Sequence, residues 1–163
     1  MRTAMTFKTA DLCDEHEAEV QICEPGFSSF GGRARFSGRI STIKCFEDNS
    51  LVREAVAEAG DGRVLVVDAG GSQRCAMLGD LLAAKAQANG WSGVLMNGLI
   101  RDSVDIAQMD LGVKALGAHP LKSVKKGVGE RDIAVRFAGV RFVPGEYLYA
   151  DEDGIICSAV ALL

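Results

Sequence analysis

"RVLVVD", residues 63–68, decides the fold, because Val64 to Val67 form an unbroken apolar run. A strand with one solvated face alternates apolar and polar residues, whereas a continuous run is typical of a strand buried on both faces. Such strands occur mainly in parallel sheets that are covered by helices. Residues 63–68 therefore predict the centre of a parallel α/β sheet.

Strand and helix patterns alternate on either side of this segment. In chain order, the expected elements are a strand over residues 37–45, a helix from about 48–50 to 59, the central strand, a helix over 78–89, a strand over 94–97, a short helix over 104–109 and a strand over 113–118. Asp48, Asn49 and Ser50 are candidate N-caps for the first helix. Strands that alternate with helices imply parallel pairing through right-handed crossovers.

The C-terminal part has a different pattern. Residues 133–158 contain short β-runs separated by Ala-Gly, Pro-Gly and Asp-Gly turn signals, which is typical of antiparallel hairpins. No Pro- or Ser-rich linker and no repeat divides the chain. The expected fold is thus one α/β domain over residues 1–163, with a parallel central sheet and additional antiparallel β-hairpins.

Composition excludes several classes of protein. The 163 residues are 48% hydrophobic and 25% charged, as in an ordinary globular protein. A net charge of −4 argues against general nucleic-acid binding, which requires an excess of Lys and Arg. No apolar run is long enough to cross a membrane, and residues 1–8 lack the apolar core of a signal peptide. We therefore expect a cytoplasmic protein with no membrane association.

Two predicted loops gather polar residues where ligands usually bind. In open α/β sheets, ligands bind beyond the carboxyl ends of the strands. The central strand is followed by residues 68–72 and then by a helix that opens with Gly79-Asp80-Leu81-Leu82, and the next strand ends at Asn97-Gly98 and leads to Arg101-Asp102. If the two strands are adjacent and parallel, both loops emerge at one edge of the sheet.

These residues have the chemistry of an anion and metal site. Free N–H groups at a helix start bind carboxylates, and Gly79 would let a ligand approach the backbone closely. Arg101 offers a fork of donors to a carboxylate or an oxyanion. Asp80 and Asp102 would bring two carboxylates to the same edge, and Mg²⁺ often takes only one or two protein carboxylates and keeps several waters.

Simpler explanations stay open for each residue. Asp80 could interact only with the helix dipole, and Asp102, or Ser103 in its place, could cap the following short helix. The Gly70-Gly71 pair is not followed by a nucleotide-binding glycine motif, and tight-turn glycines explain it. The Arg101-Asp102 pair is therefore a helix cap or a functional site, with residue chemistry alone favouring neither.

Other groups give weaker signals for catalysis. His16 lies in an acidic stretch and His119 precedes a proline, so both are expected to be ordinary surface residues. Lys44 and Lys114 are the least surface-like candidates for a Schiff-base lysine. The basic stretch 122–126 is expected to be a solvated loop. The five cysteines show no Cys-x-x-Cys spacing, which disfavours a thiolate zinc site and a disulfide framework; they are residues 13, 23, 45, 75 and 157.

Three segments resemble one known family. "EPGFSSFGGRARFSGRISTIKCFEDNSLV" (24–52), "VLVVDAGGSQRCAMLGDLLAAKA" (64–86) and "FAGVRFVPGEYLYADEDGIICS" (137–158) are similar to the RraA-like family. This family contains the regulators of ribonuclease E activity and the class II 4-hydroxy-4-methyl-2-oxoglutarate (HMG) aldolases. Its signature is an Asp, twenty intervening residues and then Arg-Asp, which Asp80, Arg101 and Asp102 match.

The resemblance implies a fold, an assembly and roles for these residues. The fold would be the swivelling β/β/α type, assembled as a homotrimer with the site between subunits. Asp102 would hold Mg²⁺ or Mn²⁺, largely through waters. Arg101 would bind the substrate together with the helix start at Gly79, Asp80, Leu81 and Leu82, and Asp80 would orient a water on the metal.

The implied activity is a metal-dependent retro-aldol cleavage. A 4-hydroxy-2-oxo dicarboxylate such as HMG would give pyruvate and a second keto acid, and oxaloacetate would be decarboxylated through the same enolate. The family's alternative activity is inhibition of ribonuclease E by direct binding, which would make that nuclease a partner. The aldolases carry a C-terminal extension that supplies an acid to the neighbouring subunit, whereas this chain ends at Leu163. Asp151, Glu152 and Asp153 are the candidates to replace that acid.

Overall fold

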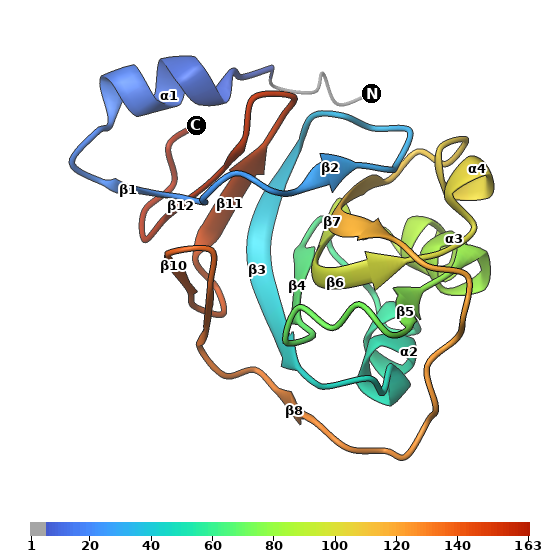
Figure 1. Ribbon diagram of the computed structural model, residues 1–163. Coiled ribbons are helices and arrows are strands. Elements are labelled where there is room, and N and C mark those ends of the chain that lie inside the picture. The colour runs from blue at the N-terminus through green and yellow to red at the C-terminus, as the bar shows by residue number, and fades with distance from the viewer. Residues whose placement is uncertain (1–5) are drawn as a thin grey trace.

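The computed structural model describes residues 6–163, and its centre is the strand expected from residues 63–68 (Figure 1). Val64 to Val67 are fully buried in β4 (Val64–Asp68). Val64 and Val66 face one hydrophobic core, and Leu65 and Val67 face the other. The unbroken apolar run therefore reflects a strand that is covered on both faces, as predicted.

A mixed sheet surrounds β4. Its strands are β1 (Val20–Ile22), β2 (Ser28–Ser29), β3 (Phe36–Lys44), β4, β5 (Ala76–Leu78), β6 (Gly93–Ile100), β7 (Gly112–Ala118), β8 (Glu130–Arg131), β11 (Tyr147–Ala150) and β12 (Ile155–Ser158). The order along the sheet is β1-β12-β11-β3-β4-β6-β7-β2, with β5 beside β6 and β8 beside β3. The neighbours β3, β4, β6 and β7 pair in parallel, and β1, β12 and β11 pair antiparallel.

Three short helices cover one face of the parallel part. They are α2 (Ser50–Val56), α3 (Asp80–Ala88) and α4 (Ser103–Ile106). Ala83 and Ala86 of α3 are fully buried, and they pack with Val52 and Val56 of α2 against the sheet. Small residues on the inner face let α3 lie close to the strands. This packing fixes the start of α3 at the carboxyl edge of the sheet.

The opposite face is covered by β structure. A two-stranded antiparallel ribbon, β9 (Val135–Phe137) and β10 (Val140–Phe142), packs with β11 and β12 against β3, β4 and β6. The side chains of Phe137 and Phe142 stack there, with ring centroids 4.5 Å apart. The hairpins expected over residues 133–158 are thus present, and the mixed α/β class with antiparallel additions is confirmed.

The N-terminal segment adds a layer that sequence patterns did not predict. Helix α1 (Thr9–Glu15) packs on β11 and β12 through Phe7 and Leu12. The buried Asp151 carboxylate binds both the N–H and the hydroxyl of Thr9 at 2.7 Å, which ties the start of α1 to the end of β11. No signal peptide is expected in residues 1–8, and residues 1–5 of that segment lie outside the described residues.

Several boundaries differ from the expected ones. The strand expected over 94–97 continues to Ile100, because β5, which was not predicted, pairs with its last residues. The helix expected to reach 59 ends at Val56, and α4 ends at Ile106 rather than 109. Within residues 6–163, no helix has both the length and the apolar character needed to span a membrane.

Candidate active site

The two predicted loops meet because β6 changes its partner. Residues 93–97 of β6 pair with β4, and beyond Asn97 the strand pairs with β5 instead. The Arg101 N–H donates to the Leu78 carbonyl at 2.9 Å, so the ends of β5 and β6 lie side by side. Gly79 and Arg101, which follow directly, therefore stand next to each other at the carboxyl edge.

Gly79 is required by space rather than by backbone conformation. Its φ of −123° suits any residue. A Cβ atom there would lie 2.9 Å from Asp102 Oδ2 and 3.3 Å from Arg101 Nε, closer than ordinary van der Waals contact. The missing side chain lets the Arg101-Asp102 pair approach the start of α3.

Asp102 caps a helix, but not the one expected from the sequence. Its side chain makes no capping bond to α4, and its own backbone is left-handed, with φ 56°. Instead, Oδ2 accepts the Asp80 N–H at 2.9 Å, across 22 residues of chain, at the start of α3. Asp102 thus stands at the N-cap position of α4, the alternative left open by the sequence, but its carboxylate does not cap that helix because it turns back towards α3.

This contact keeps Asp102 ionised. The Asp80 N–H lowers the pKa of Asp102, burial opposes the shift, and the Asp80 carboxyl and the Arg101 guanidinium lower it further. Among residues 6–163, the Asp80 N–H is the only backbone N–H that donates to the Asp102 carboxylate, and the side chain is 34% exposed. Asp102 thus keeps lone pairs that a further ligand can use.

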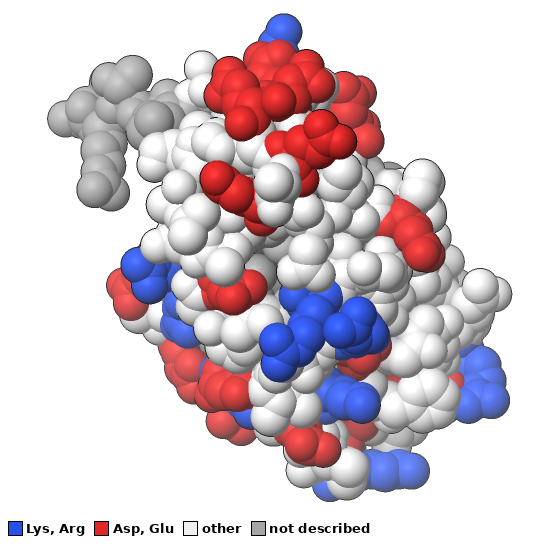
Figure 2. Space-filling model, turned by 90° about the vertical axis from the view of Figure 1, so that its left-hand side faces the viewer, with Lys and Arg blue, Asp and Glu red and all other residues white. Residues whose placement is uncertain are grey.

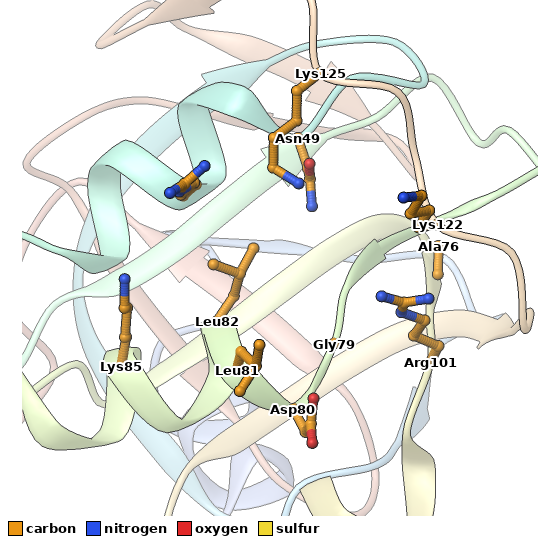
Figure 3. A pocket seen from close by; sticks show the side chains of 11 residues that line it. Asn49, Ala76, Gly79, Asp80, Leu81, Leu82, Lys85, Arg101, Lys122 and Lys125 are labelled. Atoms are coloured by element: carbon orange, nitrogen blue, oxygen red, sulfur yellow. The ribbon is translucent and has the colours of Figure 1, made fainter.

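Arg101 and the start of α3 offer donors to an anion. Arg101 Nε lies 3.9 Å from Asp102 Oδ2, and Figure 3 shows the guanidinium pointing into the pocket above Asp80. The first backbone bond of α3 runs from Ala83 N–H to the Gly79 carbonyl. The N–H groups of Leu81 and Leu82 precede that bond, and among residues 6–163 they have no acceptor.

A cavity of about 550 Å³ opens at this point. Its lining includes the predicted Gly79, Asp80, Leu81, Leu82 and Arg101. Asp102, the predicted metal ligand, is not part of the lining; it is adjacent to it through its hydrogen bond to the Asp80 N–H. The remaining lining residues were not predicted as site residues; they are Asn49, Arg53, Ala76, Lys85, Lys122 and Lys125. Five cations and one carboxylate therefore surround a cavity in a chain whose net charge is −4. Such concentrated positive charge favours an anionic ligand.

Two of these cations come from the strap, which we define as residues 119–128. The stretch 122–126 was expected to be a solvated loop; its lysines are indeed exposed, but Lys122 and Lys125 line the cavity. The strap is held along its length. The His119 N–H donates to the Ile100 carbonyl at 2.8 Å, and the Leu121 carbonyl accepts the Ala76 N–H at 2.7 Å.

Asp48 clamps the far end of the strap. Its carboxylate accepts the N–H groups of Lys126 (2.9 Å) and Val128 (3.0 Å), and also the N–H and hydroxyl of Ser50. Burial alone would raise the pKa of Asp48, but these hydrogen bonds outweigh it and lower the pKa to about 2. Asp48, expected only as a helix cap, thus also fixes the strap beside the cavity.

The donor set fits a hydrated divalent cation. Within residues 6–163, no three His, Cys, Asp or Glu side chains cluster as a complete metal cage. Asp102 and Asp80 nevertheless place two carboxylates at one edge, and Asp102 has oxygen lone pairs to spare. Mg²⁺ and Mn²⁺ accept few protein carboxylates when waters complete the shell. Asp102, with Asp80 beside it, is the position in this chain that could hold such an ion.

The other candidates lie outside this cavity. Lys114 is 4% exposed, and its ammonium donates to the Asp151 carbonyl at 2.6 Å; burial lowers its pKa. Lys44 is exposed. His119 Nδ1 accepts the Leu121 N–H, and His16 lies beside Glu15 and Glu19.

The remaining sequence features also have structural roles. The cysteines have no disulfide partners. Gly70 and Gly71, with φ of 68° and 69°, form the tight turn expected of them. Asp151 is bound to Thr9 and is 4% exposed, so it is committed within its own subunit, whereas Glu152 and Asp153 are exposed.

Fold and site together define a class: a mixed α/β protein with an arginine, two aspartates and a helix start at the carboxyl edge of its parallel sheet. The chain belongs to the RraA-like family (Aldolase/RraA), whose model matches residues 9–157. The resemblance noted in the sequence is thereby confirmed.

Similar proteins carry different names. A protein of Laribacter hongkongensis named "Putative 4-hydroxy-4-methyl-2-oxoglutarate aldolase" is 62% identical over 159 residues, which cover 98% of this chain and all of that one. A crystal structure from Geobacillus kaustophilus, described as an S-adenosylmethionine: 2-dimethylmenaquinone methyltransferase, is 51% identical with a TM-score of 0.94, covering 96% of this chain and 97% of that one.

A third similar protein is the RNA-processing inhibitor RraA of Thermus thermophilis. It is 46% identical, with a TM-score of 0.92 over 95% of this chain and 94% of that one. Three names on one fold describe three activities, so the fold cannot choose among them. The choice depends on the residues of the site.

Proposed function

We propose that this protein is a metal-dependent class II aldolase that cleaves HMG and related 4-hydroxy-2-oxo dicarboxylates to pyruvate. The observation that carries the proposal is the convergence of Arg101, Asp80 and the start of α3 on one cationic cavity, with the Asp102 carboxylate bound directly behind the start of α3. The aldolase name of relatives about 60% identical to this chain supports it. Masking a nuclease would not require a pocket of this chemistry.

The residues of the chain divide the chemistry among them. In a retro-aldol cleavage, the 4-hydroxyl loses its proton, the C3–C4 bond breaks, and its electron pair moves into the enolate of pyruvate. A proton then returns to C3. In this proposal Arg101, which lines the cavity, would stabilise the developing enolate oxygen, and the free N–H groups of Leu81 and Leu82 would bind the substrate carboxylate.

The two aspartates have separate tasks in this proposal. Asp102 would hold Mg²⁺ or Mn²⁺, which when bound supplies Lewis acidity towards the 2-keto group. Asp80, whose N–H is bound by Asp102, keeps its carboxylate at the cavity, where it can orient a water that carries protons. Oxaloacetate decarboxylation passes through the same enolate, so we propose it as a second activity.

Pyruvate release is the test. Wild type and Asp102→Asn are assayed with HMG and with oxaloacetate, each with and without Mg²⁺. We expect Mg²⁺-dependent release by the wild type and a loss of at least about 100-fold in the variant, since Asn carries no charge to hold the ion.

Asp105→Asn serves as the matched control for this assay. Asp105 is an exposed aspartate three residues further along, and its carboxylate makes no hydrogen bond to the start of α3 among residues 6–163, so its loss should leave the rate unchanged. Equal rates with and without the metal, in wild type and Asp102→Asn alike, would refute the aldolase.

Inhibition of ribonuclease E is the second candidate, favoured by the likeness to the Thermus thermophilis inhibitor. Figure 2 shows acidic side chains gathered over the α1 end of one face. The acidic residues of that segment are all exposed; they are Asp11, Asp14, Glu15, Glu17 and Glu19. Such a surface would complement a basic, RNA-binding region of the nuclease.

A binding assay separates the two functions. If both exist, Arg101→Ala loses pyruvate release but still binds the nuclease, whereas Asp14→Lys with Glu15→Lys keeps pyruvate release and weakens binding. If the wild type shows no measurable binding to the nuclease, the inhibitor role is refuted. The aldolase proposal is then decided by the pyruvate assay alone.

A further inference from the structure

The cavity extends along α3 beyond the helix start, and cationic side chains line it there as well. Arg101 and the start of α3 form one end. Lys85 of α3 and Lys125 of the strap also line the cavity; Figure 3 shows Lys85 across Leu81 and Leu82 from Arg101, and Lys125 above these leucines, beside Asn49. Arg53 of α2 completes this lining.

Three of the cations that line the cavity lack anionic partners in the described part of the chain. Among residues 6–163, no carboxylate forms an ion pair with Arg53, Lys85 or Lys125, whereas Arg33, Arg74 and Arg131 each pair with at least one. Like charges around one cavity repel each other unless an anion lies between them. The arrangement therefore favours a ligand with a second negative group.

The spacing matches a small dicarboxylate. Lys85 follows Leu81 and Leu82 by four and three residues, so all three lie on one face of α3. From Asp80 to Lys85 the helix rises about 7.5 Å. The end carboxyl carbons of a five-carbon diacid are roughly 5 Å apart, given C–C bonds of about 1.5 Å. The flexible side chain of Lys85 can cover the difference between these two lengths.

We propose that Arg53, Lys85 and Lys125 form a second anion subsite that binds the distal carboxylate of the substrate and so selects dicarboxylates. This inference rests on the proposed aldolase function for the choice of ligand. Leu81 and Leu82 contact the carbon chain between the two ends. The three residues are specificity determinants, because they bind the half of the substrate that leaves as the second product.

The test compares two substrates that differ in the distal carboxylate. HMG has this group, and 4-hydroxy-2-oxopentanoate, which would yield pyruvate and acetaldehyde, lacks it. We expect Arg53→Gln and Lys85→Gln each to lower kcat/KM for HMG about tenfold, the loss expected for one charged hydrogen bond. The value for 4-hydroxy-2-oxopentanoate should not change.

Lys126→Gln is the matched control. It removes the same charge from the strap, but the Lys126 side chain does not line this cavity. It should leave both kcat/KM values unchanged. If the Arg53 and Lys85 variants affect both substrates equally, or neither, the subsite is refuted while the aldolase stands.

A binding measurement keeps the inference testable if no turnover is found. By calorimetry, wild type should bind 2-oxoglutarate more tightly than 2-oxobutanoate, which lacks the distal carboxylate. The Arg53 and Lys85 variants should lose this preference. Absence of pyruvate with the preference intact would reject the aldolase alone, and absence of the preference in wild type would reject the subsite.

Discussion

Asp48 and Asp102 are two aspartates with the same local task and different surroundings. Each accepts a backbone N–H from a segment distant in the sequence. Asp48 is buried and its carboxylate accepts four hydrogen bonds, whereas Asp102 is half-buried and its carboxylate, among residues 6–163, accepts one backbone N–H. The Asp48 carboxylate is fully used by the fold. The fold holds the Asp102 carboxylate in place through one hydrogen bond and leaves its other lone pairs free.

The difference separates a structural carboxylate from a candidate functional one. A buried acid that is saturated with hydrogen bonds has no capacity for a ligand, and its loss leaves donors unpaired. An acid held by one hydrogen bond behind the start of a helix is oriented and still has lone pairs for an ion. This contrast between the two aspartates can be tested through the free energy of unfolding, its pH dependence and the contact at Gly79.

Truncation of the two side chains should affect stability unequally. Asp48→Ala should lower the free energy of unfolding by about 3 kcal/mol, because several charge-assisted hydrogen bonds are lost. Asp102→Ala should cost about 1 kcal/mol or less, the value of one partly exposed helix cap.

Urea denaturation at equal protein concentration measures both, because association with other subunits would add to the apparent stability. If both variants lose the same free energy of unfolding, Asp102 is a structural residue like Asp48, and the distinction between the two is refuted.

Acid should weaken the Asp48 clamp in a defined range. The pKa of Asp48 is about 2 in the folded protein and 3.8 in its ordinary state, so its stabilising effect is complete above 3.8 and is lost as pH falls towards 2. The shift corresponds to roughly 2 kcal/mol. The difference in unfolding free energy between wild type and Asp48→Ala should shrink by this amount from pH 5 to pH 2.

Paired denaturation curves at several pH values check this, since the other acids titrate in both proteins and cancel. A difference that is constant with pH would mean that Asp48 contributes packing and not charge.

The fold could be predicted from the sequence further than the site could. Burial of β4 on both faces leaves a visible apolar run, and turn glycines mark the hairpins. The three-residue β5 leaves no such pattern, and without it the strand after Val94 was expected to end at Asn97 rather than Ile100.

The site depends on contacts that no local pattern records. Asp102 reaches Asp80 across 22 residues, so the helix it caps could not be identified from its neighbours in the sequence. Arg53 and Lys85 each look like an ordinary charge on a solvated helix face. Only the packing of α2 against α3 places them around one cavity. Residue types and spacing therefore predicted the lining at Arg101 and the start of α3, and missed the lining by Arg53 and Lys85.

Gly79 gives the smallest predicted effect and tests the geometry directly. A Cβ atom in Gly79→Ala would lie 2.9 Å from Asp102 Oδ2 and 3.3 Å from Arg101 Nε. Both atoms are on side chains that can shift by a few tenths of an ångström, so stability should change by less than about 1 kcal/mol. Pyruvate release should fall about tenfold, because small displacements of catalytic groups are costly.

Gly154→Ala is the control for that substitution, since a Cβ there meets nothing within 4 Å and its φ is not in the left-handed region. Its activity and stability should equal those of the wild type. A Gly79→Ala variant with full activity would show that the Arg101-Asp102 pair tolerates displacement from α3. The single hydrogen bond to Asp80 would then be a helix cap that does not position Asp102 for catalysis.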